Sequence, residues 1–117
     1  MSFIHARRDE LLFYVNLFGT VNVFYTWIPC SHCKKTLPIV QAATAAGTRY
    51  PVLQMIADEH TALQRTANLV GYPTIRQYQL KNKGSATGQE SDFYTKEFWG
   101  RREIKHLQEF FNTPLSE

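Results

Sequence analysis

The only two cysteines of this 117-residue chain lie in one short segment, Cys30-Ser31-His32-Cys33. Two cysteines at this spacing can close a small disulfide ring with each other, and they leave no cysteine for a cross-link between distant parts of the chain. The fold must therefore be held together by side-chain packing, as is usual for proteins of a reducing compartment. This one motif constrains both the fold and the chemistry of the chain.

A C-x-x-C motif has two common interpretations, a redox-active pair and half of a zinc site. A tetrahedral zinc site needs four ligands, so without further cysteines it would have to recruit histidines. The histidines are His5, His32, His60 and His106, and they lack the paired spacing of metal ligands. The sequence therefore favours thiol-disulfide chemistry and predicts neither a metal site nor another cofactor.

The composition is typical of one globular domain. With 44% hydrophobic residues, the chain is long enough to bury a sizeable core and too short for two ordinary domains, so we expect a single domain over residues 1–117. The net charge of +3 comes from short basic clusters with acidic residues between them. This pattern is typical of solvated surface, and no RNA-binding motif accompanies it, so we expect no nucleic-acid partner.

Residues 11–29 carry no charged side chain, but their hydrophobic period changes midway from helical to extended, so we expect no membrane span. Polar or small residues interrupt the stretch at Asn16, Gly19, Thr20 and Asn22. The N-terminus is a poor signal peptide, because Arg7-Arg8 is followed at once by Asp9-Glu10. We expect a cytoplasmic protein, with the endoplasmic reticulum or secretion as the alternative if a leader has been removed.

Hydrophobic periodicity predicts alternating helices and strands. Helices are expected at residues 2–18 with Ser2 as the cap, at 33–46 with Pro38 inside, at 58–69 with Asp58 as the cap, and after Gly100. Strands are expected at 21–26, 52–57 and 74–80, and a short one at Phe93-Tyr94 after a polar loop over 81–91. Expected inward contacts of the last two helices are Ala62, Leu63, Ala67, Val70, Ile104, Leu107, Phe110 and Phe111. This order predicts an α/β sandwich with a central mixed sheet of about four strands flanked by helices.

The chain resembles the thioredoxin fold, and most closely the catalytic domains of protein disulfide isomerase. Residues 24–34 are similar to that family's F-Y-x-x-W-C-G-H-C-K, and Gly71 to Ile75 reproduce its G-Y-P-T-I. Pro38 has the family's helix proline spacing, and residues 98–102 are similar to its late aromatic-x-G-x-R. The resemblance covers about residues 20–111 and leaves a short tail at 112–117, and it implies a thioredoxin-like three-layer sandwich.

The resemblance implies a division of roles at the motif. Cys30 is expected to be the exposed nucleophile that forms a mixed disulfide with substrate, and Cys33 the buried resolving thiol. His32 is expected to stabilise the Cys30 thiolate, which favours oxidation or isomerisation over strong reduction. The alternative for His32 is a solvated side chain without redox effect.

The same resemblance implies that Pro73 is a cis-proline opposite the disulfide, with the backbone of Tyr72 free to pair with an extended substrate. An ordinary trans proline at the start of a strand is the alternative. Trp27 stands two positions earlier than the family's tryptophan. It is expected either to cover the disulfide as an apolar lid that contacts substrate or to belong to the core.

Two further departures concern proton transfer. The family's buried acid lies six residues before the first cysteine, where this chain has Phe24, or Val23 after a shift of one residue. Gln54 stands where thioredoxins often have the lysine that pairs with this acid. Deprotonation of Cys33 is then expected to rely on water or on Arg102, which matches an arginine thought to approach the active site in disulfide isomerases. A solvated arginine at a helix start is the alternative for Arg102.

The sequence thus predicts a thiol-disulfide oxidoreductase that oxidises or isomerises cysteine-containing proteins and is itself recharged by an upstream thiol oxidase or reductase. A thioredoxin-like disulfide reductase is the nearest alternative. The others are a redox-inactive binding module, which would use the Tyr72-Pro73 edge and the 81–91 loop, and a redox sensor whose partner affinity follows the oxidation of the cysteines. No membrane partner is expected.

Overall fold

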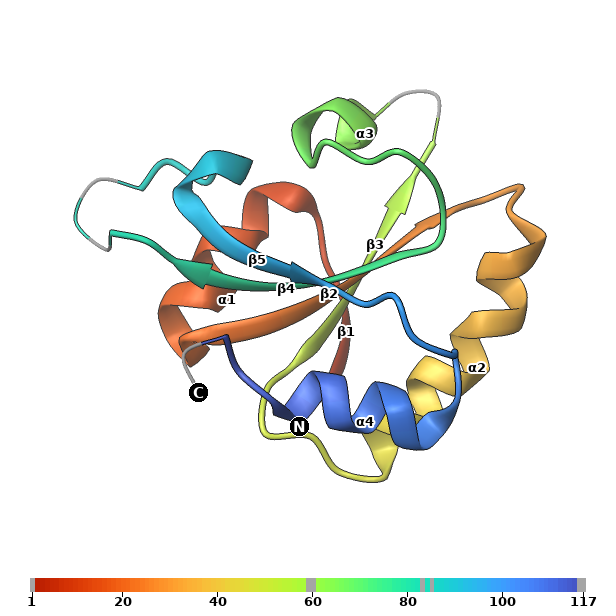
Figure 1. Cartoon of the computed structure of the whole chain (residues 1–117). Coiled ribbons are helices and arrows are strands. Elements are labelled where there is room, and N and C mark those ends of the chain that lie inside the picture. The colour runs from red at the N-terminus through yellow and green to blue at the C-terminus, as the bar shows by residue number, and fades with distance from the viewer. Residues whose placement is uncertain (1, 59–60, 83, 85, 116–117) are drawn as a thin grey trace.

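A computed structural model describes residues 2–58, 61–82, 84 and 86–115 of the chain. Its centre is a five-stranded mixed sheet in the order β1-β3-β2-β4-β5 (Figure 1). The strands are β1 (Phe3–His5), β2 (Thr20–Trp27), β3 (Val52–Ala57), β4 (Thr74–Leu80) and β5 (Phe93–Glu97). The neighbouring strands β1, β3 and β2 run parallel to one another. Strand β4 runs antiparallel to β2, and β5 runs antiparallel to β4. The predicted mixed α/β sheet is confirmed, with one strand more than expected.

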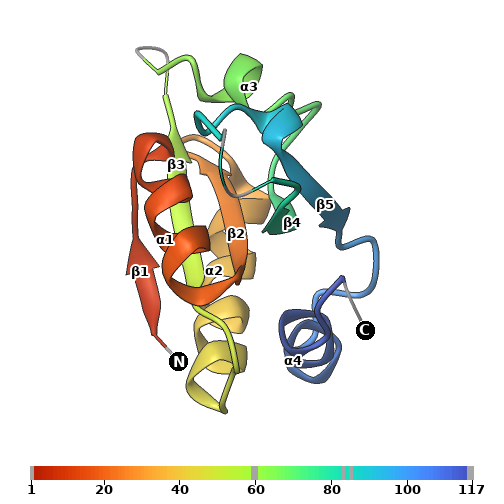
Figure 2. The ribbon, with the colours of Figure 1, turned by 90° about the vertical axis from the view of Figure 1, so that its left-hand side faces the viewer.

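Helices cover both faces of this sheet, which gives three layers (Figure 2). The α-helices are α1 (Leu11–Phe18), α2 (Ser31–Ala45), α3 (Leu63–Thr66) and α4 (Ile104–Asn112), and two 3-10 turns are η1 (Arg8–Glu10) and η2 (Glu90–Asp92). Buried residues of α1 and α3 belong to one core cluster, and those of α2 and α4 to another. No helix of the described residues is long and apolar enough to cross a membrane.

The central strand β2 shows why both layers form. Its residues alternate between the two faces, as the pleat of a strand requires. Val23 and Tyr25 lie in the cluster under α1 and α3, whereas Phe24 lies in the cluster under α2 and α4. All three side chains are fully buried. Burial of β2 on both faces explains the near-continuous hydrophobic run of this part of the sequence. The cysteine motif follows directly after the carboxyl end of this strand.

The N-terminal helix predicted over residues 2–18 is wrong in its first half. Phe3–His5 form the edge strand β1, and helix α1 begins only at Leu11. The carbonyl of Ser2 accepts a hydrogen bond from the N–H of Val52, and Ala6 donates to the carbonyl of Gln54, so Ser2 is not a helix cap. Strand β3 would otherwise present a row of unpaired backbone groups at the sheet edge, and β1 covers them.

The helix predicted over residues 58–69 is reduced to α3, Leu63–Thr66. Ala62 has a non-helical backbone (φ −86°, ψ 18°), and Asn68 adopts a positive φ of 55° that ends the turn. The N-cap of α3 is Ala62, so Asp58 is not the cap of this helix, and the N–H of Asp58 donates to the hydroxyl of Thr61. Residues 59 and 60 lie outside the described part of the chain.

Several predicted inward contacts are also corrected. Val70 is 93% exposed, Ile104 is 45% exposed and Ala62 is exposed, while Leu63, Ala67, Leu107 and Phe111 are buried as expected. Because α3 ends at Leu63 and Thr66, Ala62 and Val70 lie outside the helix. They therefore do not share its buried face, and both are exposed. Helix α2 begins at Ser31 and contains Pro38, so the predicted proline inside this helix is confirmed.

Candidate functional site

The cysteine motif lies where β2 ends and α2 begins. The N–H of Cys30 donates to the carbonyl of Trp27, which closes the turn between the two elements. Cys30 itself is the N-cap of α2, with an extended backbone at φ −81° and ψ 111°. An N-cap side chain can accept a hydrogen bond from the first turn of its helix, where backbone N–H groups lack partners.

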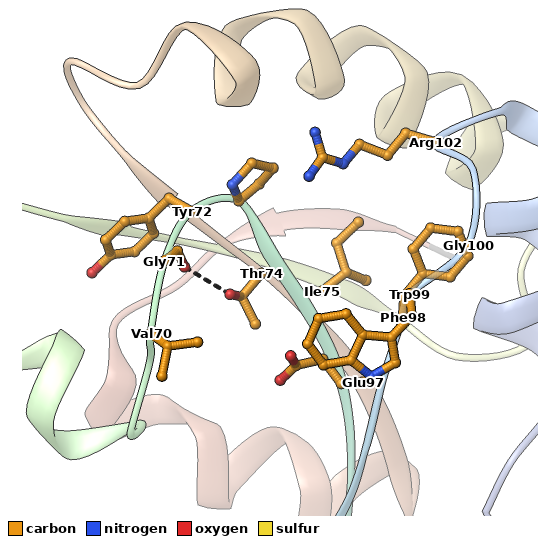
Figure 3. A pocket seen from close by; sticks show the side chains of 11 residues that line it. Val70, Gly71, Tyr72, Thr74, Ile75, Glu97, Phe98, Trp99, Gly100 and Arg102 are labelled. Carbon is orange, nitrogen blue, oxygen red and sulfur yellow. Dashed lines mark hydrogen bonds between the residues drawn. The ribbon is translucent and has the colours of Figure 1, made fainter.

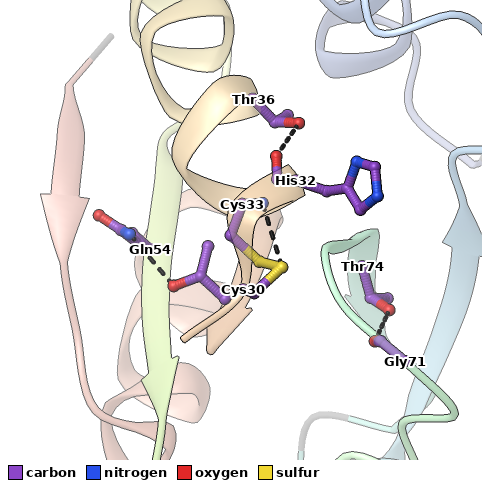
Figure 4. Close-up of a disulfide and its surroundings, with 8 residues drawn as sticks. Cys30, His32, Cys33, Thr36, Gln54, Gly71 and Thr74 are labelled. Atoms are coloured by element: carbon purple, nitrogen blue, oxygen red, sulfur yellow. Dashed lines mark hydrogen bonds between the residues drawn. A yellow bond between two sulfur atoms is a disulfide. The ribbon is translucent and has the colours of Figure 1, made fainter. Parts of the chain in front are cut away.

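Cys30 and Cys33 form a disulfide, with their Cα atoms 5.2 Å apart (Figure 4). The N–H of Cys33 donates to the Sγ atom of Cys30 at 3.1 Å. The predicted pairing of the two cysteines is therefore confirmed. The same N–H can stay with Cys30 Sγ when the sulfur carries a negative charge, because the start of a helix favours anions.

The two sulfurs differ in accessibility. Cys30 is partly exposed, whereas Cys33, in the first turn of α2, is 4% exposed. An incoming thiolate must approach a disulfide sulfur directly, so the more accessible Cys30 Sγ is the sulfur that a protein thiol can reach. This difference is the one that the sequence resemblance implied.

His32 is exposed on the first turn of α2, and its ring points away from the two sulfurs in Figure 4. Within the described residues its ring makes no hydrogen bond to either cysteine, and its carbonyl accepts a hydrogen bond from the hydroxyl of Thr36. Any effect of His32 on Cys30 must therefore act through its charge or after a side-chain rotation. Its redox role stays a prediction.

The Tyr72-Pro73 peptide bond is cis, as predicted. It lies in the short loop before β4, in which the hydroxyl of Thr74 donates to the carbonyl of Gly71. Strand pairing between β2 and β4 stops at Tyr25 and Thr74, so it does not extend to Tyr72. Among the described residues, no backbone hydrogen bond occupies the N–H or the carbonyl of Tyr72, and both groups remain available to an extended chain.

Trp27 is 46% exposed, so the interpretation of Trp27 as a core residue is wrong. Its ring stacks on the ring of Tyr72, with centroids 6.2 Å apart and planes at 26°. The pair joins the end of β2 to the cis-proline loop. The other alternative, Trp27 as an apolar lid that covers the disulfide and contacts substrate, stays a prediction.

Behind Cys33, a small cavity of about 130 Å³ is lined by Thr26 and Gln54 among others. Gln54 donates to the hydroxyl of Thr26 at 3.2 Å, and both side chains are buried (Figure 4). Phe24 and Val23 lie in the core clusters on the two opposite faces of the sheet. Neither side chain can take over the proton-accepting role of the buried acid that the resembling family has at this position. Of the described residues that form the cavity walls, Lys34 alone is charged, and the volume is sufficient for water.

Arg102 lies in the loop before α4 and lines a groove of about 270 Å³ beside the cis-proline loop (Figure 3). Its side chain is exposed, and it forms no ion pair with any of the described residues. Its guanidinium reaches across the groove toward the Tyr72 side in Figure 3. The predicted approach of Arg102 to the active-site cysteines, and its effect on the proton of Cys33, stay predictions beside the alternative of a solvated arginine.

Sequence reasoning missed two exposed apolar residues of this region, Val70 and Trp99, which are 93% and 81% exposed. Both line the groove with Arg102. Val70 was assigned to a helix face, and only the shortness of α3 places it at the surface. Trp99 could have been found, because a large aromatic residue directly before Gly100 belongs to a loop.

The described residues contain no group of three or more His, Cys, Asp and Glu side chains that could hold a metal ion. His60, one of the histidines considered above, lies outside the described residues. The site as described consists of the Cys30–Cys33 disulfide, an open backbone edge at Tyr72 and a rim of apolar and basic side chains.

No protein-family model matches the sequence, and no curated protein matches it. Solved structures do match. The J-Trx1 fragment of ERdj5 is 20% identical with a TM-score of 0.71, covering 92% of this chain and 47% of the fragment. A mutant thioredoxin from Halobacterium salinarum is 18% identical with a TM-score of 0.67, covering 94% of this chain and 87% of that chain.

The first thioredoxin domain of mouse Protein disulfide-isomerase A4 is also similar, at 20% identity and a TM-score of 0.60, over 84% of this chain and 64% of that chain. The chain thus spans about half the length of the ERdj5 fragment and most of the length of the single-domain thioredoxin. These likenesses show a thioredoxin fold, with the disulfide at the C-x-x-C position of the motif.

Proposed function

We propose that this chain is a thiol-disulfide oxidoreductase that exchanges disulfides with cysteine-containing client proteins. The observation that carries the proposal is the Cys30–Cys33 disulfide at the N-terminus of α2, with one accessible sulfur and one buried sulfur. A structural cross-link would have no need of this asymmetry, and a ring that joins residues three apart stabilises little of the fold. The thioredoxin fold supports the proposal.

The proposed exchange proceeds in two steps. A client thiolate attacks Cys30 Sγ, the bond between the two protein sulfurs breaks, and its electron pair leaves on Cys33 Sγ. A second client thiolate then attacks the client sulfur of this mixed disulfide and releases Cys30 as a thiolate. The client has lost two electrons and gained a disulfide, and the protein has gained both electrons. A thiol oxidase must take them up before the next round. In isomerisation the Cys30 thiolate instead attacks a client disulfide, and a different client thiolate then displaces Cys30 to form a new client disulfide, with no net transfer of electrons.

The leaving order follows from the surroundings of the two sulfurs. The N–H of Cys33 and the start of α2 favour negative charge on Cys30 Sγ, so Cys30 is a good leaving group when the client sulfur is attacked. A stabilised thiolate also favours the reduced protein and makes its disulfide a stronger oxidant. This is our reason to propose an oxidising or isomerising tendency, with His32 adding to it when its imidazole is charged.

Single cysteine variants test the proposal. We expect Cys30→Ser to abolish exchange with a fluorescent dithiol peptide, because the accessible sulfur is gone. Cys33→Ser has no disulfide to offer a dithiol, so it is tested with a peptide whose cysteine is activated as a mixed disulfide with 2-thiopyridine. Its Cys30 thiolate should react once, releasing 2-thiopyridone, and then keep the peptide as a mixed disulfide, visible as a mass shift that dithiothreitol reverses. The double variant is the control for exchange by other routes.

The binding-module alternative makes the opposite prediction. A passive module would capture client proteins equally well in the wild type and in Cys30→Ser, and neither protein would change the redox state of the peptide. Equal and unmeasurable exchange rates in the wild type and Cys30→Ser would therefore contradict an oxidoreductase. The reduction potential separates the two directions: a value near about −180 mV supports oxidation or isomerisation, and one near about −270 mV supports a thioredoxin-like reductase.

A further inference from the structure

The cis-proline loop is bordered by a groove on one side and a hollow on the other, and both are open to solvent. The groove, about 270 Å³, lies between the loop and the segment Glu97 to Arg102 (Figure 3). The hollow, about 420 Å³, lies between the loop and the end of β3, beside Trp27. Val70, Gly71 and Tyr72 line both. A chain extended along Tyr72 would place its side chains alternately on the two sides.

Two apolar side chains in the wall of the groove are unusually exposed. Val70 is 93% exposed and Trp99 is 81% exposed, although an isolated domain gains nothing by presenting such side chains to water. Tryptophan is also among the residues that contribute most to binding when a partner covers them. Figure 3 shows Val70 on one side of the groove and Trp99 on the other.

The charges of the groove are unequally compensated. Glu97 also lines it, but its carboxylate is held by Arg76, whose Nη2 and Nε lie 2.7 and 3.0 Å from Glu97 Oε1. Arg102 has no such partner among the described residues. Among the described residues, the guanidinium of Arg102 is therefore the uncompensated positive charge of the groove. The side chain of Arg102 projects over the groove from the side opposite Tyr72 (Figure 3).

We propose that this groove binds the segment of a client protein next to its reactive cysteine, and that Arg102 selects segments with an acidic side chain there. The inference rests on the proposed function, because it requires a client cysteine at Cys30. Arg102 pairs with the client carboxylate, for which its planar guanidinium is well suited, and Trp99 and Val70 cover the apolar part of the segment. Clients with a lysine at the same place are disfavoured, because two cations would face each other.

The test uses short peptides with one cysteine, activated as a mixed disulfide with 2-thiopyridine. The residue beside the cysteine is Glu, Gln or Lys in otherwise identical peptides, with each flank varied separately. The Cys30 thiolate of the reduced protein attacks the peptide sulfur, and the bond to the pyridyl sulfur breaks to release 2-thiopyridone, whose absorbance is followed. The readout is the ratio of the second-order rate constants for the Glu and Gln peptides.

We expect the wild type to react about fivefold faster with the Glu peptide than with the Gln peptide on one flank, as for a well-placed exposed ion pair, and slowest with Lys. Arg102→Gln should bring the ratio to about one, and Arg102→Glu should reverse it in favour of Lys. Arg101→Gln is the matched control, because Arg101 is also exposed but lines a different surface, beside Phe110. It should keep the ratio of the wild type.

A ratio near one in the wild type on both flanks would overturn the inference while leaving the exchange reaction itself demonstrated. An equal loss of preference in Arg101→Gln and Arg102→Gln would also overturn it, since general attraction by the basic surface would then explain the preference. If no peptide reacts at all, the proposed function fails and this inference with it. Trp99→Ala should slow all peptides without changing the ratio, and unchanged rates would exclude Trp99 from the binding wall.

Discussion

Cys30 and Cys33 have the same chemistry and different neighbours. The N–H that contacts Cys30 Sγ belongs to the first turn of α2, where the helix leaves backbone donors without internal partners. Cys33 lies one turn further in and is buried. A negative charge is therefore stabilised more at the first sulfur than at the second, and the order of bond breaking proposed above follows from this local difference.

The neutral pair of Thr26 and Gln54 lies behind Cys33, beside the cavity that Cys33 also lines. Their hydrogen bond satisfies the amide nitrogen of Gln54 and leaves the hydroxyl proton of Thr26 available to another acceptor. Among the residues that the structure describes, no carboxylate lines this cavity. Without an internal acid among these residues, water in the cavity and Arg102 remain the expected routes for the proton of Cys33.

His32→Pro is predicted to lower the reduction potential of the Cys30/Cys33 couple. The imidazole, when charged, stabilises the Cys30 thiolate and so the reduced protein, and proline removes this charge. We expect a decrease of about 30 mV or more, which corresponds to a tenfold change in the equilibrium constant. Equilibration with glutathione buffers, followed by thiol alkylation, measures it.

The matched control is Ser31→Pro, which introduces proline at the first helical position and keeps the imidazole. Proline is well tolerated there, and the extended backbone of Cys30 suits a residue that precedes proline. The potential of Ser31→Pro should stay near that of the wild type. An unchanged potential in His32→Pro would show that the exposed His32 has no redox effect.

The residues of the site were predictable where their roles depend on neighbours close in sequence. Cys30, Cys33 and Pro73 were found because a short motif surrounds each of them. Trp27 could not be placed, because its position depends on stacking with Tyr72, which lies on a different element. Gln54 was noticed by its spacing alone, and its bond to Thr26 follows from the pairing of β2 with β3.

At the level of elements, strand β1 shows where periodicity fails. Phe3 and Ile4 continue an apolar pattern that α1 shares, so the sequence favours one long helix. The decisive partner is the free edge of β3, which comes much later in the chain. A long-range hydrogen-bonding requirement therefore overrides a local preference. The strands β2, β3 and β4 were predictable because they are buried and rich in branched and aromatic residues.

Ala6→Pro tests the contribution of this edge pairing. The N–H of Ala6 donates to the carbonyl of Gln54 at 3.0 Å, and proline removes that donor. We expect the free energy of unfolding to fall by about 1–3 kcal/mol in urea titrations, because the carbonyl of Gln54 loses its partner. Ala6→Ser keeps the N–H and should change stability by less than about 0.5 kcal/mol. Equal stabilities of the two variants would show that β1 contributes little to the sheet.

At the scale of the whole molecule, a buried polar cluster joins segments far apart in sequence. The hydroxyl groups of Tyr25 and Tyr78 lie 2.6 Å apart. Tyr78 donates to the carboxylate of Glu90, which also accepts from Arg8 and Arg76 at 2.8 Å. The cluster thereby connects η1, β2, β4 and η2 across one face of the sheet. No local pattern in the sequence could reveal it, because each partner comes from a different element.

This cluster predicts an alkaline limit to stability. Burial raises the pKa of Tyr78 far above its usual value, with the neighbouring Tyr25 and Glu90 adding to the effect, and burial likewise raises the pKa of Tyr25 although Arg8 opposes it. Folding therefore favours the neutral phenols. This stabilisation is fully present below a pH of about 10, where the unfolded chain also keeps its phenol protons, and it is lost as the pH rises further.

We expect the free energy of unfolding to fall above a pH of about 10 by about 1.4 kcal/mol per pH unit for each such tyrosine. Urea titrations of the wild type and Tyr78→Phe over this range measure the slope, which should decrease in the variant by one tyrosine's share. Tyr94→Phe is the control, because it removes a tyrosine that is 55% exposed and lies outside the cluster. If Tyr78→Phe keeps the slope of the wild type, Tyr78 ionises as readily in the folded protein as in the unfolded chain. The hydrogen bonds of the cluster would then not hold it in the neutral form.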